Sequence, residues 1–372
     1  PSGLQIVVDG TSYIAPQTFN WTVESSHTLS VSSPQDGSSG TRYVYSSWSD
    51  GGTQTHTITV PSSSTTYTAN FITQHRLTTS VSPSVGGTVN PAGMNWYNSG
   101  QSVSISATAS AGYTFSNWSG NLSGSTNPTS ITMSGPKSVV ANFTQNQYTL
   151  TINISPSNSG SVSKSPNKST YVYGEQVSLT ATANAGYAFS NWSGGASGSS
   201  NPTTITIDGN KTVTANFTAE TISTPAVPTG PTGGITGVSY TYSTGGSSSN
   251  IGHSVQYQFD WKGDGTDLSS WGSATQSKTW TAAGAFNVRS RARCSICTTV
   301  LSAWSASISV SISVAPVSCT VTTSPSGLQM TVDGSSYTGP QTFTWTPGTS
   351  HTLSVSSPQN ATSDTRYVYS SW

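Results

Sequence analysis

Internal repetition constrains the fold more than any other feature of this sequence. The phrase GYTFSNWSG at 112–120 returns as GYAFSNWSG at 186–194, and a looser version, YVYSSWSDG, stands at 43–51. The offset is 192 − 118 = 74 for the tryptophans and 217 − 143 = 74 for the phenylalanines of the closing phrase ANF. Self-similarity at a fixed period is the sequence signature of copied structural units. We therefore expect a string of small, related domains.

A second repeat is longer. PSGLQIVVDGTSY opens the sequence and PSGLQMTVDGSSY returns at 325, which gives an offset of 325 − 1 = 324. Roughly three-quarters of the aligned positions are identical, far more than unrelated segments would share. The match ends with Trp372 opposite Trp48. We expect one full period of a larger repeat, followed by the start of the next copy.

Period-two alternation predicts strands. In VSLTATA, from 177 to 183, apolar residues alternate with Ser and Thr, and SVSISATA from 102 to 109 repeats the pattern. Such alternation is typical of half-buried antiparallel strands. Clusters such as SGSTNP at 123–128 and PSNSG at 156–160 punctuate them as turns. No stretch combines helical periodicity with caps, so the sequence predicts an all-β protein.

The repeated tryptophan has two interpretations. Strict alternation puts Tyr113 and Phe115 on one face and Trp118 on the other, so a bulge is needed to bring the indole back. A unit of about 72 residues needs large apolar side chains to fill its core. We therefore predict that Trp118 and Trp192 are buried. The alternative is an exposed sugar-binding platform.

Charge is scarce and balanced. Only 6% of residues are charged, with 12 Lys and Arg against 12 Asp and Glu, so the sequence offers no basic patch for nucleic acid. Eleven Trp and 16 Tyr argue against disorder. The sequence contains no run of about 18 apolar residues, which a membrane-spanning helix would need. A neutral, hydroxyl-rich surface favours an extracellular or cell-surface location.

The cysteines and histidines predict no cofactor and no metal site. The pair Cys294-Ser-Ile-Cys297 is followed by Thr instead of His, which excludes a haem attachment motif, and no second pair completes a zinc motif. Two interpretations of this pair remain open: a local disulfide between the two cysteines, or two inert thiols. Cys319 is left over, as a free thiol or an interchain partner. No histidine stands at metal-ligand spacing to another; the five are His27, His56, His75, His253 and His351.

Two charged groups each have a structural and a functional interpretation. Asp260, Asp264 and Asp267 form the one acidic cluster. They suit a tight turn, because Asp accepts local backbone hydrogen bonds; the alternative is calcium, although the D-x-D-x-D-G spacing is missing. The other group, Arg289, Arg291 and Arg293, alternates along one predicted strand. It suits an exposed strand face, or a contact face for a neighbouring copy or an acidic polysaccharide.

The repeat unit resembles a known family. YTLTINISP, GSVSKSP, GYAFSNWSG and NPTTITIDGNKTVTANF in 148–217 are similar to the divergent internalin-type B-repeat, or bacterial repeat domain. The resemblance covers 75–218 best and extends to 1–73 and 318–372. It implies tandem domains on secreted or surface-anchored bacterial proteins that act as spacers or adhesive stalks, without catalytic residues.

The segment from about 225 to 315 differs from the repeats. VQYQFDWKGDGTDLSSW, SKTWTAAGAFNVRSRARC and LSAWSASISVSISV resemble a polycystic-kidney-disease-type (PKD) domain, although the turn carries an extra residue and Phe286 replaces the usual Tyr. The resemblance implies an immunoglobulin-like β-sandwich. We expect five units: repeat units at 1–73, 74–145 and 146–219, a PKD-like sandwich at 220–316, and a truncated copy of 1–48 at 317–372.

These observations lead to one functional hypothesis and one alternative. The hypothesis is a non-enzymatic structural segment of a secreted or cell-surface bacterial protein: a stalk, adhesin shaft or extracellular fibre that contacts copies of itself or polysaccharide. The alternative is a carbohydrate-binding accessory region of a secreted hydrolase. The strand phrase SCTVTTS at 318–324 has no counterpart before Pro1, and TYTANF at 66–71 has none after Trp372. We expect both end units to be completed along one continuous chain or, alternatively, by strand donation between subunits.

Overall fold

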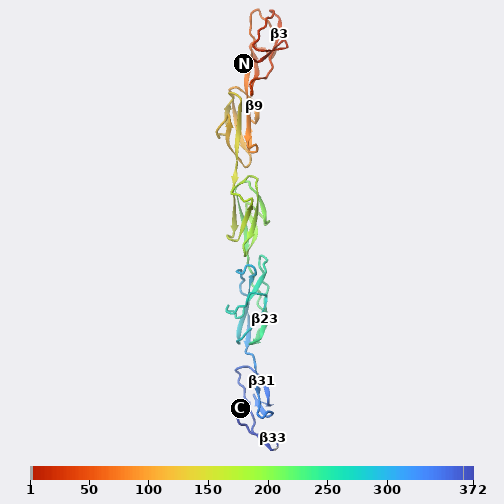
Figure 1. The fold of residues 1–372 in the computed structure, drawn as a ribbon, viewed down its shortest axis with the longest axis vertical. Coiled ribbons are helices and arrows are strands. Elements are labelled where there is room, and N and C mark those ends of the chain that lie inside the picture. The colour runs from red at the N-terminus through yellow and green to blue at the C-terminus, as the bar shows by residue number, and fades with distance from the viewer. Residues whose placement is uncertain (1–2, 363) are drawn as a thin grey trace.

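The computed structural model describes residues 3–362 and 364–372, so Pro1 and Ser2 of the first expected unit lie outside it. This described part contains strands, turns and loops but no helix, and therefore no helix able to cross a membrane. The strands form small domains that follow one another end to end in a rod (Figure 1). The prediction of tandem small β-domains is confirmed.

The first domain packs a four-stranded sheet, β2-β1-β3-β6, against a sheet that contains β4, β5 and β7. Its core gathers around Trp48. Its strands are β1 Gln5–Val8, β2 Thr11–Ile14, β3 Ser26–Ser30, β4 Gln35–Asp36, β5 Thr41–Trp48, β6 Thr55–Thr59 and β7 Ala69–Ser82. The last of these continues into the second domain, so the predicted boundary between residues 73 and 74 falls inside one strand.

The second and third domains are built alike, each with a three-stranded sheet that faces a second sheet, and in the second domain this second sheet is part of a six-stranded sheet shared with the first domain. In the second, the end of β7 joins β13 and β11 opposite β8-β10-β12; in the third, β15-β21-β19 lies opposite β16-β18-β20. The remaining strands of the second domain are β8 Gly87–Asn90, β9 Gly93–Asn98, β10 Ser102–Ala109, β11 Tyr113–Gly120, β12 Thr129–Thr132 and β13 Lys137–Gln145. Those of the third are β14 Gln147–Tyr148, β15 Leu150–Ser155, β16 Gly160–Ser165, β17 Tyr171–Val172, β18 Gln176–Ala183, β19 Tyr187–Gly194, β20 Thr203–Thr206 and β21 Lys211–Ala219.

One feature of these domains departs from the antiparallel prediction. The first and last strands of each copy pair in parallel: Leu77–Ser82 of β7 with β13, and β15 with β21. Alternation of apolar and polar residues reports which face is buried and is the same for both pairing directions, so it did not reveal this. Parallel first and last strands mean that the chain enters a domain at one end and leaves it at the other.

The fourth domain is a β-sandwich. A four-stranded sheet, β22-β27-β26-β24, faces the pair β23-β25 across a core rich in aromatic rings, including Trp261 and Trp280. Here too the first strand, β22, runs parallel to the last, β27. The strands are β22 Gly233–Ile235, β23 Ser239–Ser243, β24 Val255–Asp260, β25 Thr275–Thr279, β26 Gly284–Cys294 and β27 Ile308–Ser313. The expected β-sandwich is confirmed.

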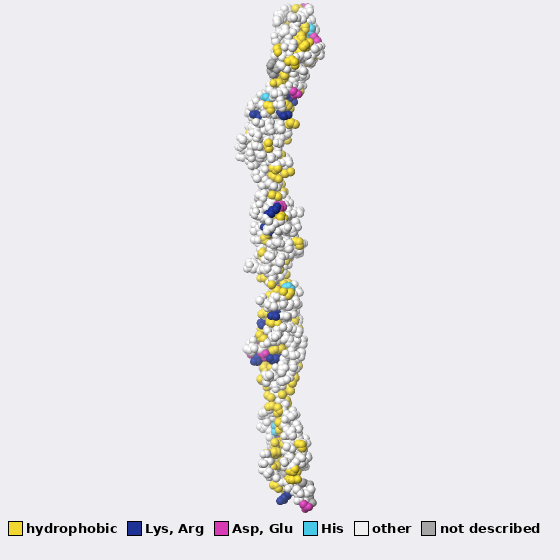
Figure 2. All heavy atoms as spheres, in the orientation of Figure 1, with side chains coloured by type: hydrophobic (Ala, Val, Ile, Leu, Met, Phe, Trp, Pro, Cys, Tyr) yellow, Lys and Arg dark blue, Asp and Glu magenta, His cyan; other side chains and the backbone are white. Residues whose placement is uncertain are grey.

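The last segment resembles the first domain in its early strands. The predicted opening strand SCTVTTS is present as β28 Val317–Val321, paired with β31 Gln341–Trp345. Its other strands are β29 Gln329–Val332, β30 Ser335–Thr338, β32 Leu353–Ser354, β33 Gln359–Thr362 and β34 Thr365–Tyr367. Figure 2 shows charged side chains along the rod as isolated spots on a mostly uncharged surface.

Candidate functional site

The repeated tryptophans lie in domain cores. Trp118 and Trp192 are each 1% exposed. The register of β11 shifts between Phe115 and Asn117, just before the tryptophan, and β19 shifts at the equivalent place. This is the bulge that the spacing required. The indole N–H of Trp118 donates to the Thr126 carbonyl at 2.9 Å, and Trp192 makes the equivalent bond. The prediction of core packing is confirmed.

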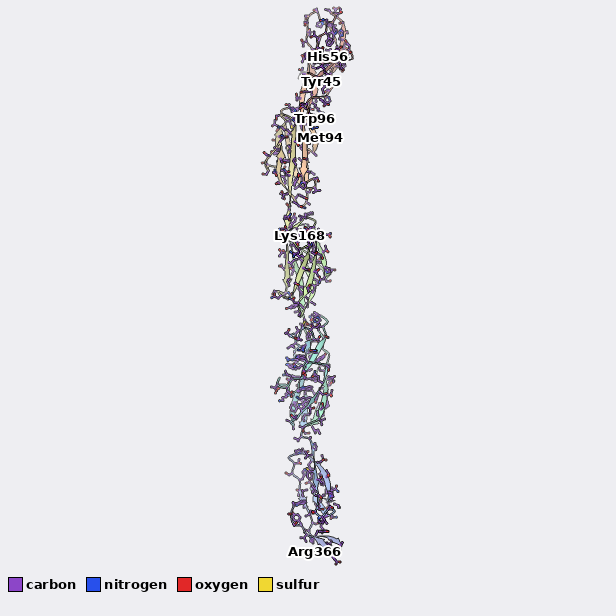
Figure 3. The ribbon with its side chains drawn as sticks, in the orientation of Figure 1. Tyr45, His56, Met94, Trp96, Lys168 and Arg366 are labelled. Atoms are coloured by element: carbon purple, nitrogen blue, oxygen red, sulfur yellow. The ribbon has the colours of Figure 1, made fainter. Side chains whose placement is uncertain are left out.

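A continuous strand joins the first two domains. β7 pairs antiparallel with β5 along its first half and parallel with β13 along its second half, while β9 pairs with its middle. The Arg42 guanidinium lies 4.6 Å from the centre of the Trp96 ring on β9. Figure 3 shows Trp96 at this joint, with Met94, 68% exposed, beside it on the same strand. No loop separates the two domains at β7.

The next two joints share one backbone arrangement. The N–H of Asn146 donates to the Gly112 carbonyl at 2.8 Å, and the N–H of Glu220 donates to the Gly186 carbonyl at 2.8 Å. These positions are related by the repeat offset, since 220 − 146 = 74 and 186 − 112 = 74. The Asn146 side chain accepts a hydrogen bond from the Thr114 hydroxyl at 2.7 Å. The copies therefore share a joint but place an amide in one and a carboxylate in the other.

At the joint with the sandwich, Glu220 forms hydrogen bonds with residues of both domains. Asn250 of the sandwich donates from Nδ2 to the Ala219 carbonyl at 3.0 Å and accepts from the Thr221 N–H at 2.8 Å. The Ser249 hydroxyl donates to Oε1 of Glu220 at 2.7 Å. These bonds fix the carboxylate against the start of the sandwich.

Four potential metal ligands converge at this joint: Glu220, His253, Cys294 and Cys297. Each offers one ligand atom, and these atoms all lie within 4.8 Å of one another, an arrangement found at no other place in 3–362 and 364–372. Nδ1 of His253 is 3.2 Å from Oε1 of Glu220 and 3.5 Å from Sγ of Cys294. The backbone N–H of Cys297 donates to Sγ of Cys294 at 3.0 Å.

The cluster is mostly closed to solvent. The side chains of Glu220 and Cys294 are fully buried, Cys297 is 7% exposed and the His253 side chain is 29% exposed. Burial raises the pKa of Glu220, but hydrogen bonds with Ser249, Cys294 and His253 outweigh it, so the net pKa is lowered. Burial also raises the pKa of the Cys297 thiol. Oε2 of Glu220 has no hydrogen-bond partner.

Sequence reasoning found the cysteine pair and missed the residues around it. His253 lies 294 − 253 = 41 residues before Cys294, and Glu220 lies 294 − 220 = 74 residues before it, so no local motif connects the four. A signal did exist, because a Glu stands at 220 where the preceding repeat has Asn146. Both cysteines of the pair are buried and are not bonded to each other in this structure.

The acidic cluster of the sandwich lies in a turn, and Asp260 stabilises that turn. Asp260 is fully buried, accepts the N–H groups of Gly263 and Gly265 at 2.9 Å each, and pairs with Arg289 at 3.0 Å. The other two carboxylates have separate partners: Asp264 binds Thr266, and Asp267 binds Lys278 at 2.7 Å. The three carboxylates suggested for calcium therefore face different neighbours.

The three alternating arginines form a stacked ladder with tryptophans. Arg289 and Arg291 lie 4.9 and 4.5 Å from the Trp304 ring, and Arg291 and Arg293 lie 5.4 and 4.5 Å from the Trp271 ring. Their guanidinium groups also bond to side chains of β24, which are Asp260, Gln258 and Gln256. Much of their hydrogen-bonding capacity is thus used within the domain.

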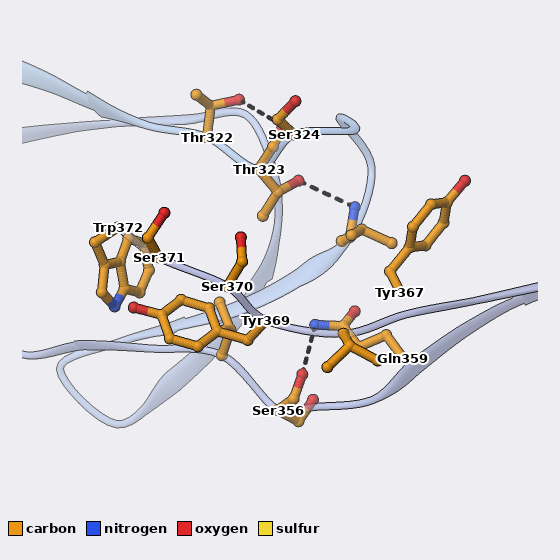
Figure 4. Close-up of a pocket in the computed structure, with 13 residues that line it drawn as sticks. Thr322, Thr323, Ser324, Ser356, Gln359, Tyr367, Tyr369, Ser370, Ser371 and Trp372 are labelled. Atoms are coloured by element: carbon orange, nitrogen blue, oxygen red, sulfur yellow. Dashed lines mark hydrogen bonds between the residues drawn. The ribbon is translucent and has the colours of Figure 1, made fainter.

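A pocket of about 370 Å³ lies in the last segment (Figure 4). Its lining consists of hydroxyl, amide, aromatic and aliphatic side chains, including Gln359, Tyr369 and Trp372. Trp372 is 60% exposed, whereas Trp48, its counterpart in the first domain, is 4% exposed and pairs with β7. Cys319, for which a free thiol and an interchain partner were both open, is half-buried on β28 and is bonded to no other cysteine of the chain.

Comparison with known proteins identifies the repeats. Residues 77–147 and 148–221 each match the model of the divergent InlB B-repeat domain. The chain therefore contains two such repeats in tandem, within three residues of the predicted boundaries. No curated protein matches the chain.

Among solved structures, one similar chain is the PKD domain of an M14-like peptidase from Thermoplasmatales archaeon SCGC AB-540-F20. It is 26% identical, covers 24% of this chain and 94% of its own length, and gives a TM-score of 0.21. The sandwich described above rests on its own strand pairing.

Proposed function

We propose that this chain is a stiff, non-catalytic shaft segment of a secreted or cell-surface bacterial protein, which holds an attached domain away from its anchor. The observation that carries the proposal is the parallel pairing of the first and last strands. It occurs in the second domain, in the third domain and in the sandwich. A domain connected in this way adds its full length to the rod.

The same pairing supports resistance to tension. Pulling on the two ends of the third domain draws β15 and β21 past each other, because they run in the same direction and lead to opposite ends. Six residue pairs join them, from Leu150–Lys211 to Ser155–Asn216. Their hydrogen bonds are loaded together rather than one after another. At the first joint, the continuous strand β7 passes tension directly from one domain to the next.

The alternative of carbohydrate binding has less support. A sugar platform needs exposed, coplanar aromatic rings, but Trp118 and Trp192 are buried. Two other tryptophans each have one ring face covered by a histidine. Trp21 stacks on His27 with ring centres 4.1 Å apart, and Trp345 stacks on His351 at the same distance. Hydrolysis of a glycoside commonly needs a pair of carboxylates beside the substrate, and the residues around the 370 Å³ pocket include none.

Single-molecule stretching tests the proposal. Unfolding the 74 residues of 148–221 releases about 250 Å of extended chain. The folded domain already spans about 30 Å, judged from the 9 residues of β21. We therefore expect a regular series of force peaks, including steps of about 220 Å from the two matched repeats.

A variant and its control locate the mechanical element. Asn153→Pro interrupts β15 and should lower the force of one peak, because proline removes an N–H from the strand. Ser199→Pro, in an exposed loop of the same domain, should leave that force unchanged. Smooth extension without peaks, or equal forces for both variants, would contradict the proposal.

A further inference from the structure

We propose that Glu220, His253, Cys294 and Cys297 bind one zinc ion, which clamps the third domain to the sandwich. The proposal goes beyond the shaft function and does not rest on it. Glu220 follows β21 within the matched repeat 148–221, whereas the other three ligands belong to the sandwich. An ion held by all four would tie the two domains together directly.

The spacing of the ligand atoms suits tetrahedral coordination. With Zn–S of about 2.3 Å and Zn–N and Zn–O of about 2.1 Å, tetrahedral angles place sulfur and nitrogen about 3.6 Å apart and nitrogen and oxygen about 3.4 Å apart. The structure has Sγ of Cys294 3.5 Å from Nδ1 of His253. It has Nδ1 3.2 Å from Oε1 of Glu220. Two edges of the tetrahedron are thus already formed.

The electrostatics of the cluster also favour a cation. Oε2 of Glu220 is buried without a hydrogen-bond partner, and an unpaired buried polar atom is costly. The N–H of Cys297 points at Sγ of Cys294, and hydrogen bonding to sulfur favours the thiolate over the thiol. A divalent ion would displace the thiol protons and offset two of the three negative charges of the carboxylate and the two thiolates.

The identity of the donors selects the metal class. Two thiolates and an imidazole are ligands of zinc and other soft or borderline transition metals, whereas calcium and magnesium prefer oxygen donors alone. Four protein ligands also leave no open coordination position, which is typical of structural rather than catalytic zinc sites. His253, with 29% of its side chain exposed, marks the side from which the ion would enter.

The preceding joint provides an internal comparison. Its backbone hydrogen bond is the same, but Asn146 takes the place of Glu220 and bonds to Thr114 and Tyr148. No cysteine lies in the second or third domain. The carboxylate therefore appears at the one of these two joints where histidine and both cysteines are also present.

Metal analysis of the whole chain tests the site. Reduced, metal-free protein is mixed with a small excess of Zn²⁺, desalted and analysed for zinc and protein. We expect one ion per chain, and proton release on binding, since the thiols must deprotonate. Glu220→Asn, which installs the residue of the preceding joint, should weaken binding by about 100-fold or more. Cys294→Ser and Cys297→Ser should abolish stoichiometric binding, whereas Cys319→Ser and His56→Asn should retain it.

Three further measurements keep the test decisive. Co²⁺ in place of Zn²⁺ should give the absorption of a tetrahedral thiolate complex in the wild type and lose it in Cys297→Ser. Circular dichroism on every variant shows that it is folded. Zinc should also slow proteolysis near residues 220–222, because it ties the joint. Folded wild-type protein that retains no zinc, binding unaffected by the cysteine variants, or a Cys294–Cys297 disulfide that excludes zinc from protein purified without reductant would overturn the proposal.

Discussion

Replacing Trp192 by alanine should remove a large part of the stability of the third domain. A buried tryptophan hides about 150–250 Å² of surface, which at about 25 cal/mol/Å² is about 4–6 kcal/mol. Measured aromatic-to-alanine changes cost about 3–5 kcal/mol, so we expect about 4 kcal/mol. A 74-residue domain has about 4–11 kcal/mol in all. Removal of the indole also leaves the Ser200 carbonyl without its donor at 2.9 Å.

Hydrogen exchange followed by mass spectrometry measures this loss within the full chain. Peptides from β18 to β21 should exchange about 1,000-fold faster in Trp192→Ala, since 1.4 kcal/mol corresponds to a factor of ten. Peptides from 77–147 in the same molecule should not change, because their core belongs to another domain. Trp372→Ala, which removes an indole that is 60% exposed, should alter stability by less than about 0.5 kcal/mol. A loss below about 1 kcal/mol for Trp192→Ala would refute the core assignment.

Three further predictions concern charged side chains. Asp260→Asn should destabilise the sandwich by about 3–5 kcal/mol in chemical denaturation, because it leaves the Arg289 guanidinium without its buried partner. The control variant Asp264→Asn, at an exposed position, should cost less than about 1 kcal/mol. A calcium chelator should have no effect on the stability of the sandwich. Hydrogen bonds from His27 and from the Thr28 N–H lower the pKa of Asp9 from its ordinary value of 3.8, so its contribution to stability is present above pH 3.8 and is lost as the pH falls below that value; Asp9→Asn should remove this pH dependence from thermal unfolding curves. Arg291→Lys should cost about 1–2 kcal/mol, because lysine replaces neither the stacking on Trp304 nor the paired bonds to Gln258, and an unchanged unfolding midpoint would contradict the ladder.

Much of the fold was predictable because the repeats align with one another at a constant offset along the sequence. The offset of 74 residues placed both buried tryptophans, and the three-residue step from Phe115 to Trp118 required the bulge that the structure has. Strand direction was not predictable in the same way. Alternating residues bury the same face in parallel and antiparallel pairs, so the parallel pairing of β15 with β21 is visible only in three dimensions.

The joint cluster was beyond local sequence patterns for a related reason. His253 and Glu220 reach Cys294 through the end-to-end packing of two domains, and their separations along the chain match no compact metal motif. The turn at Asp260 was predictable because Asp-rich turns bond to their own backbone within a few residues. The tryptophan partners of the arginine ladder were not, since Trp271 and Trp304 come from loops on either side of β26.

The copied domains keep the same buried tryptophan but use different side chains where they meet, and this difference has a physical reason. A buried indole such as Trp118 touches its core from every side, so any change there costs several kcal/mol, and Trp192 repeats it. A joint is contacted by only a few residues and tolerates a change of chemistry. The chain uses a continuous strand with an Arg42–Trp96 contact at its first joint, Asn146 at the second, and Glu220 with two cysteines and a histidine at the third. We therefore expect the bending stiffness of the proposed shaft to be determined joint by joint, while the strands fix the length that each domain adds.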